Sequence, residues 1–249
     1  MTDERLIKSA DRVKDVGEVF TPKRIVDLML DQPEISAKVN DLTAAFLEPS
    51  AGEGAFLTEL LKRKMQVALE GSTSVENYED RILLALSSLY GIELMEDNYR
   101  MLRHNLYQTF AVNYLRGLKT KGQPEHGKPK VLKSAKTIIF ANMVQGNTLT
   151  YKNVQDQPIV FSEWASYKQD NRIWVKRTTQ TFESIVEGEQ TDNGLVVPED
   201  SQLDLFTDFD PDTHEVKSKD SYLQYKPVQI VDVYKEELVD TNLVDTNKE

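Results

Sequence analysis

A turn that contains two glycines, Glu48-Pro49-Ser50-Ala51-Gly52-Glu53-Gly54-Ala55-Phe56, lies between an apolar segment and a helical one. The apolar lead-in ends a predicted strand over residues 42–47, and residues 54–69 predict a helix. A strand, a glycine turn and a helix N-terminus together form a nucleotide-type pocket, because glycine lets the backbone approach a ligand and the helix end has free N–H groups. The turn lacks the Gly-Lys-Ser/Thr ending of triphosphate-binding loops, so it favours an adenosyl ligand.

Polar residues follow two further predicted strands. Residues 89–93 predict a strand that ends in Glu93. Residues 137–141 predict another strand or the approach to one, which a turn at Gly146-Asn147 follows. The alternation of strands and helices predicts an α/β fold, with a mostly parallel sheet and helices on both faces. Ligands of such sheets bind at the carboxyl ends of the strands, so we expect Glu48, Glu93 and Asn147 to converge there.

The remaining segments predict one core and one extension. Thr21-Pro22 opens a helix, and the apolar residues of 97–115 have helical spacing. Further apolar or alternating runs predict strands or hairpins at 158–161, 172–186 and 227–233, whereas residues 192–220 are loop-like. We therefore expect a core over residues 1–165 and, over 166–249, a hairpin with an acidic, partly loop-like C-terminal extension.

The charge is unevenly distributed along the 249 residues. The net charge is −11, but residues 1–150 are neutral, residues 151–181 have a net charge of +2 and residues 182–249 have −13. An acidic tail repels a phosphate backbone, so any contact with DNA is expected from the neutral-to-basic part or from a partner. The alternative is that the tail simply keeps the protein soluble.

Composition also argues against several other classes of protein. The chain has no cysteine, and its three histidines are far apart, so neither a disulfide nor a metal site is expected. Its N-terminus is charged and no long apolar run follows, which predicts neither a secretory signal nor a membrane span. We therefore expect a soluble cytoplasmic protein.

Four motifs resemble those of the S-adenosylmethionine-dependent adenine-N6 DNA methyltransferases of restriction-modification systems. They occur in the order found in that family and cover residues 17–150: Gly17-Glu18-Val19-Phe20-Thr21-Pro22, the glycine turn at 48–56, Gly91-Ile92-Glu93-Leu94 and Gly146-Asn147-Thr148-Leu149. In the last motif this family usually has Asp where this chain has Asn147. The resemblance implies a Rossmann-like methyltransferase fold and S-adenosylmethionine as cofactor.

The resemblance also implies a set of cofactor-binding residues: Phe20, Thr21, Pro22, Glu48, Pro49, Ser50, Gly52, Gly54, Phe56, Glu93, Leu94, Asn147 and Leu149. Backbone N–H groups near the two glycines suit the carboxylate of the cofactor, Glu48 suits its cationic side, and Glu93 suits its ribose hydroxyls. Asn147 faces the adenine edge, and the two phenylalanines pack on the cofactor. The alternative roles are structural: core aromatics, solvated acids and a plain strand-to-helix turn.

The catalytic motif of the family, Asn/Asp-Pro-Pro-Tyr/Phe, has no counterpart here, because the chain contains no Pro-Pro pair. Two segments are candidates for its place. Residues 158–164 end a strand with Ser162, Glu163 and Trp164, where Glu163 accepts from the target amine and Trp164 stacks on a flipped base. Residues 181–189 resemble the strand that precedes the motif but lack the aromatic. The structural alternative is that Trp164 packs in the core.

The sequence thus predicts a DNA methyltransferase, of adenine-N6 type, that contacts DNA directly or through a partner subunit. One alternative is a catalytically degenerate, cofactor-binding subunit or interaction protein that needs a second chain for DNA recognition. Another is a methyltransferase that acts on protein or RNA.

Overall fold

The computed structural model describes residues 12, 21–124, 126–188, 209–210, 215–216 and 223–240. Its first elements are α2 (Lys23–Leu30), α3 (Pro33–Val39), β1 (Phe46–Glu48), α4 (Ala55–Glu70), α5 (Val75–Ser87), β2 (Leu89–Glu93), α6 (Glu96–Thr120), α7 (Pro129–Asn142) and β3 (Met143–Asn147). They are followed by β4 (Lys152–Asn153), β5 (Val160–Gln169), β6 (Arg172–Thr181), α8 (Phe182–Glu187), β7 (Phe209–Asp210), β8 (Glu215–Val216), β9 (Leu223–Tyr225), β10 (Val228–Gln229), the 3-10 helix η1 (Ile230–Lys235) and β11 (Leu238–Asp240).

The main sheet has the strand order β1-β2-β3-β4. The first three strands are parallel, with Phe46 opposite Leu89 and Gly91 opposite Met143, and β4 is antiparallel to β3. The predicted α/β class, with a mostly parallel sheet flanked by helices, is confirmed. This arrangement is compatible with a Rossmann-like fold.

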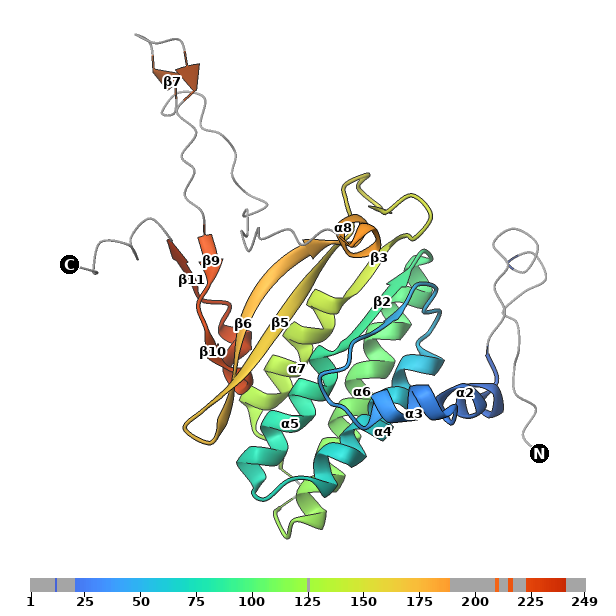
Figure 1. Cartoon of the computed structure of the whole chain (residues 1–249), viewed down its shortest axis with the longest axis vertical. Coiled ribbons are helices and arrows are strands. Elements are labelled where there is room, and N and C mark those ends of the chain that lie inside the picture. The colour runs from blue at the N-terminus through green and yellow to red at the C-terminus, as the bar shows by residue number, and fades with distance from the viewer. Residues whose placement is uncertain are drawn as a thin grey trace.

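The two faces of the sheet are covered differently. The order runs one way from β1 to β3, so right-handed crossovers place the connecting helices α4 to α7 on the same face. Figure 1 shows these helices side by side behind the sheet. Leu89 of β2 packs with them in the main core. On the opposite face, Ile92 packs with Phe161 of β5 and Phe182 of α8. Helices were predicted on both faces; on this second face the structure has the hairpin and the six-residue helix α8.

The long hairpin β5–β6 extends beyond the sheet and over the helices (Figure 1). Val175 of β6 and Ile230 of η1 lie in the same core as helices α4 to α7. Asp80 of α5 is fully buried and accepts two hydrogen bonds from the Arg172 guanidinium, at 2.8 and 2.7 Å. The boundary predicted at residue 165 falls inside β5, and Ile173 and Val175 of β6 belong to the main core.

Three local predictions differ in part from the structure. Residues 137–141, predicted as a strand or the approach to one, are the end of helix α7, which leads directly into β3. They are helical because the buried side chains of that segment recur at helical spacing: Val131, Ala135, Ile138, Ile139 and Asn142. Residues 227–233 form only the two-residue strand β10 before η1 begins. Residues 172–186 are a strand only up to Thr181, whose side chain caps α8. The predicted loop over 192–220 lies mostly outside the described residues.

Lys64 of α4 is fully buried beneath the loop that leads into β1. Its ammonium donates to the carbonyl oxygens of Asp41 (3.0 Å) and Ala44 (2.7 Å) and to the Ser88 hydroxyl (2.7 Å). Burial lowers the pKa of Lys64 to about 8. This cation satisfies backbone oxygens that the short strand leaves without a partner, and so it fixes the start of β1.

Candidate functional site

The two glycines of the turn have left-handed backbone conformations, with φ of +55° at Gly52 and +88° at Gly54. A Cβ on Gly54 would lie 2.6 Å from Leu102 Cδ1 of α6, so this glycine permits close packing of the turn on the helix. A Cβ on Gly52 would have no atom of the described residues within 4 Å. Gly52 therefore faces open space, and it is the point at which a ligand can approach the backbone.

Glu93, at the end of β2, holds this turn in place. Its carboxylate accepts hydrogen bonds from the backbone N–H of Gly52 (2.8 Å) and of Met95 (2.8 Å), and from the Asn98 amide (3.4 Å). The side chain is buried. The sequence predicted Glu93 as an acceptor for ligand hydroxyls, but in the structure the carboxylate orders the glycine turn instead.

The backbone donors of the turn are also used internally. The N–H of Gly52 donates to Glu93, and that of Gly54 donates to the Ala51 carbonyl at 2.8 Å. The N–H groups in the first turn of α4, including those of Ala55 and Phe56, have no intrahelical acceptor. An anion at this site would therefore be bound by the start of α4 and not by the glycines themselves.

A cavity of about 660 Å³ lies over the turn. It is walled by the glycine turn, the start of α4, one side of α6 and part of the α2 region; its lining residues are Thr21, Met29, Glu48, Ser50, Ala51, Gly52, Glu53, Ala55, Phe56, Thr58, Asn105, Gln108 and Thr109. We call this the turn cavity. Its volume is in the range that binds cofactors of nucleoside size.

The turn cavity brings together five of the predicted cofactor residues, Thr21, Glu48, Ser50, Gly52 and Phe56. The other described ones are not among its lining residues: Pro22, Pro49, Gly54, Glu93, Leu94, Asn147 and Leu149. Phe20 lies outside the described residues. Of the three strand-end residues predicted to converge, only Glu48, at the end of β1, lines the turn cavity; Glu93 of β2 and Asn147 of β3 do not.

Glu48 is the acid that faces the turn cavity. Burial raises the pKa of its carboxyl group, and the backbone N–H of Ser50 lowers it in part. A partly desolvated carboxylate without a cation beside it is electrostatically unfavourable in the folded protein. Such a group at the wall of a cavity is suited to a cationic ligand group.

The turn after β3 contacts the glycine turn without facing its cavity. The Thr148 hydroxyl donates to the Pro49 carbonyl at 2.5 Å. The Asn147 side chain accepts from the Leu149 N–H at 2.9 Å, and Leu149 itself is 91% exposed. Asn147 therefore shapes its own turn, and the role predicted for it toward adenine stays a prediction.

Sequence reasoning missed the contribution of α6 to the turn cavity. Asn105, Gln108 and Thr109 form a neutral polar stripe on this helix, and the Asn105 amide donates to the Glu53 carbonyl at 2.9 Å. Only the apolar spacing of α6 was used in the prediction. The spacing of Asn105, Gln108 and Thr109 (i, i+3 and i+4) places them on one face of the helix, and this polar face was the signal that could have indicated a wall of the cavity.

The predicted catalytic residues lie on β5, away from the turn cavity. Trp164 is 7% exposed, and its indole N–H donates to the Asn142 side chain at 2.9 Å. Ser162 is buried and accepts from Arg177 at 2.8 Å, whereas Glu163 is exposed and accepts from Gln180 at 2.9 Å. Trp164 is therefore a core residue, and we do not retain it as a stacking residue for a base.

A second cavity, of about 270 Å³, lies beside the outer edge of β1. We call it the edge cavity; its lining residues are Ala45, Leu47, Tyr90, Phe161, Ser162, Glu163, Gln180 and Ile185. Its walls are mostly apolar, and burial raises the pKa of the Tyr90 hydroxyl, which donates to the Ser162 carbonyl at 3.0 Å. Ser162 and Glu163 face this edge cavity, so their surroundings differ from those of the turn cavity.

Within the described residues, no cluster of three or more His, Asp or Glu side chains is placed to bind a metal ion. The helices in that part of the chain include none with both the length and the apolar character needed to cross a bilayer. Comparisons with models of protein families, with curated proteins and with solved structures found no match.

Proposed function

We propose that this chain binds S-adenosylmethionine in the turn cavity and serves methyl transfer to the N6 amine of adenine in DNA, as part of a restriction-modification system. The observation that supports this most is the wall of the turn cavity, where Gly52, Glu48 and the first turn of α4 lie together. The open space over Gly52 lets a ligand lie against the backbone. The Glu48 carboxylate suits the cationic groups of the cofactor, and the N–H groups at the start of α4, which have no intrahelical acceptor, suit its carboxylate.

In this proposal the residues have distinct tasks. The N–H groups of Ala55 and Phe56 bind the carboxylate of the methionine end, and Glu48 attracts the ammonium or sulfonium. Glu93 is a positioning residue, because it holds Gly52 and touches no ligand itself. Bound S-adenosylmethionine would supply an activated methyl group, and the cavity would contribute mainly alignment.

Calorimetric titration with S-adenosylmethionine tests this proposal. Gly52→Ala places a methyl group over the turn and is expected to weaken binding at least about tenfold. Gly122→Ala is the matched control, because Gly122 also has a positive φ (+69°) and an unobstructed Cβ position, yet does not line the cavity. Absence of binding by the wild type would refute the cofactor, and equal binding by Gly52→Ala and the wild type would refute this site.

A second candidate is a subunit that is completed by another chain. The chain has no Pro-Pro pair, and the aromatic proposed in its place is packed in the core. Within the described strands, β1 has a neighbour on one side only. In doubly wound sheets the ligand lies beside the first strand, where the strand order reverses, and here no described strand occupies the other side.

The edge of β1 has features that suit an added strand. The Phe46 N–H donates to the Ser88 carbonyl at 2.9 Å, so the alternation of a parallel ladder directs the backbone groups of Leu47 away from β2. The Leu47 side chain is 39% exposed and lines the edge cavity. A partner strand could pair with this backbone and place apolar side chains in that cavity.

Methyl transfer assays separate the two candidates. The chain alone, with labelled cofactor and mixed-sequence DNA, is expected to transfer methyl groups if it is a complete enzyme. If it is a subunit, it binds cofactor without transfer, and activity appears only when the product of an adjacent reading frame is added. Leu47→Asp should then abolish the restored activity while cofactor binding persists.

A further inference from the structure

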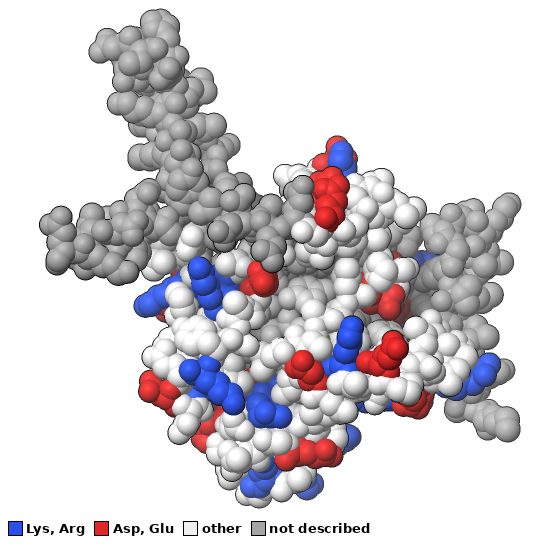
Figure 2. Space-filling view, in the orientation of Figure 1, with Lys and Arg blue, Asp and Glu red and all other residues white. Residues whose placement is uncertain are grey.

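Positive charge is concentrated in one segment of an acidic protein. On the face shown in Figure 2, Lys and Arg side chains are interspersed with Asp and Glu side chains. Residues 100–142, in contrast, contain nine Lys and Arg and a single acid, Glu125, although the whole chain has a net charge of −11. This segment comprises most of α6 and all of α7, which pack against each other.

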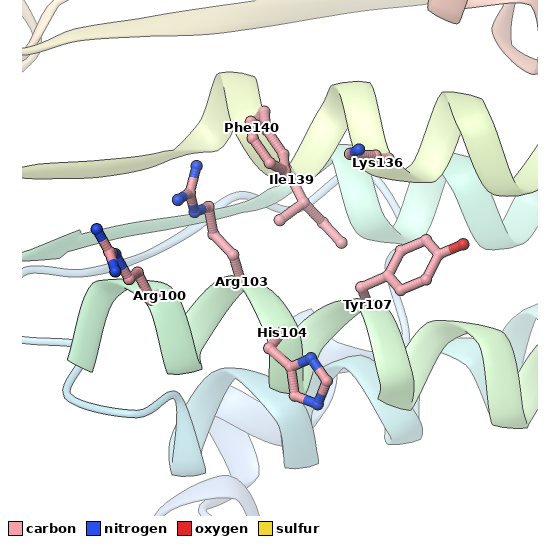
Figure 3. A pocket seen from close by; sticks show the side chains of 7 residues that line it. All are labelled: Arg100, Arg103, His104, Tyr107, Lys136, Ile139 and Phe140. Atoms are coloured by element: carbon pink, nitrogen blue, oxygen red, sulfur yellow. The ribbon is translucent and has the colours of Figure 1, made fainter. Parts of the chain in front are cut away.

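Part of this charge lines a cavity of about 350 Å³ between the two helices. We call it the helix groove; Arg100, Arg103, His104 and Tyr107 come from α6, and Lys136, Ile139 and Phe140 come from α7 (Figure 3). Arg100 also pairs with Glu96 one turn earlier, on the surface. The helix groove therefore combines cationic side chains with aromatic rings, and its lining includes no carboxylate.

Arg103 is the central cation of the groove. Figure 3 shows its side chain extending from α6 toward Phe140, and its guanidinium carbon lies 4.3 Å from the centre of that ring and 4.0 Å from the centre of the Tyr99 ring. Its Nε atom is buried without a hydrogen-bond partner. In the described part of the chain, no carboxylate forms an ion pair with Arg103. The two rings hold the guanidinium in place, and its N–H groups can donate to an external acceptor.

Phe140 adds an exposed aromatic ring to these cations. Its ring is 51% exposed, and the Lys136 ammonium lies 5.5 Å from its centre. One turn earlier on α7, Lys133 is exposed beside Tyr234 of η1. This combination suits single-stranded nucleic acid: its phosphates can pair with the cations, and its bases can stack on the exposed aromatic ring. An acidic peptide would satisfy only the cations.

We infer that the helix groove between α6 and α7 binds single-stranded nucleic acid, with Arg103, Lys133 and Lys136 toward phosphates and Phe140 stacked on a base. The groove is lined by residues other than those of the turn cavity. The inference therefore does not depend on the proposed cofactor, and either can fail without the other.

Fluorescence anisotropy of the full chain with a labelled oligonucleotide of about 20 nucleotides tests the inference. Lys133→Glu combined with Lys136→Glu is expected to weaken binding more than about tenfold and to reduce the salt dependence by one to two ion equivalents. Phe140→Ala should weaken binding to the single strand about tenfold and leave its salt dependence unchanged. The matched control is Lys168→Glu combined with Lys176→Glu, which makes the same change of charge on exposed positions of the β5–β6 hairpin.

Three results would overturn the inference. The first is absence of oligonucleotide binding by the wild type at low salt. The second is equal loss in the groove variant and in the hairpin control, which would indicate diffuse attraction. The third is binding of polyglutamate of equal charge as tightly as the oligonucleotide, with no effect of Phe140→Ala, which would assign the groove to an acidic peptide.

Discussion

Helix α6 forms a wall of two cavities that differ in chemistry. Toward the turn cavity it presents neutral polar side chains, Asn105, Gln108 and Thr109. Toward the helix groove it presents Arg100, Arg103, His104 and Tyr107, and between these two faces lies a buried stripe of Leu102, Leu106 and Phe110. One helix thus separates an acidic, glycine-walled site from a basic, aromatic one. The difference in lining suits the two cavities to ligands of different chemistry.

Two cations close to these cavities illustrate the same contrast. The Lys64 ammonium is surrounded by oxygen atoms of the protein itself, so its charge has a structural purpose. Arg103 has aromatic neighbours and, among the described residues, no carboxylate partner. A cation whose partners are all internal donates its hydrogen bonds to the fold itself, whereas a cation without a hydrogen-bonded or ion-paired partner is available for an external ligand.

The largest effect is expected from the shared wall. Leu102→Ala removes a fully buried side chain of α6 that packs against Gly54 of the glycine turn. We expect a loss of about 2–5 kcal/mol in the free energy of unfolding, measured by urea denaturation, and weaker binding of ligands in both cavities. Met101→Ala is the control on the exposed side of the same helix. If only one ligand were affected, the two cavities would not share this support.

The contrast between the cations predicts a smaller effect. Lys64→Met should destabilise the protein by about 2–3 kcal/mol at pH 7, because buried carbonyls lose their donor. Arg103→Met should change the free energy of unfolding by less than about 1 kcal/mol, since the methionine can still pack between the Tyr99 and Phe140 rings and no described carboxylate loses an ion pair. Equal losses in the two variants would contradict the proposed external role of Arg103.

The pH dependence of the Lys64 variant adds a check. The pKa of this lysine is about 8 in the folded protein and near its ordinary 10.5 in the unfolded chain. Between these values the unfolded state binds more protons, so the stability of the wild type relative to Lys64→Met should rise with pH, by at most about 3 kcal/mol. Chemical unfolding of both proteins between pH 7 and 10 measures this difference.

The smallest effect concerns the acid of the turn cavity. Because burial raises the pKa of Glu48, its ionised form is disfavoured in the folded state. Glu48→Gln should therefore raise the free energy of unfolding slightly at pH 7, by less than about 1 kcal/mol, and this gain should vanish below the ordinary pKa of the carboxyl group. The same variant should weaken S-adenosylmethionine binding. A variant that is less stable at pH 7 would show that Glu48 has a structural partner.

Much of the first half of the fold could be predicted from local signals. The helix after the glycine turn and the strand ending at Glu93 were predicted close to their observed limits, because apolar runs and glycines lie at their boundaries. The first strand was predicted over residues 42–47 but comprises only Phe46–Glu48. Residues 137–141 were predicted as a strand or the approach to one because all five are apolar or β-branched. Phe140 is exposed in the helix groove, so this run gave no sign of which side was buried.

The candidate sites show the same division. Gly52 and Glu48 were predicted correctly as neighbours, because a strand end and the turn after it are adjacent in the chain. The helix groove was not predicted, because its cations lie on two helices that meet only in the folded protein. The role of Trp164 depended on which side of β5 faces the core, and an alternating pattern cannot distinguish a core from a base-binding surface.

The sequence alone determined the glycine turn, the strands around it and the excess of positive charge in residues 100–142, since backbone conformation and charge are properties of neighbouring residues. Tertiary structure decided that Glu93 holds Gly52, that Trp164 packs beside Asn142 and that Arg103 lies between two rings. These outcomes depend on which distant groups meet, and a carboxylate or a guanidinium can bind either a protein atom or a ligand. Only the packing of helices and strands settles which partner each one has.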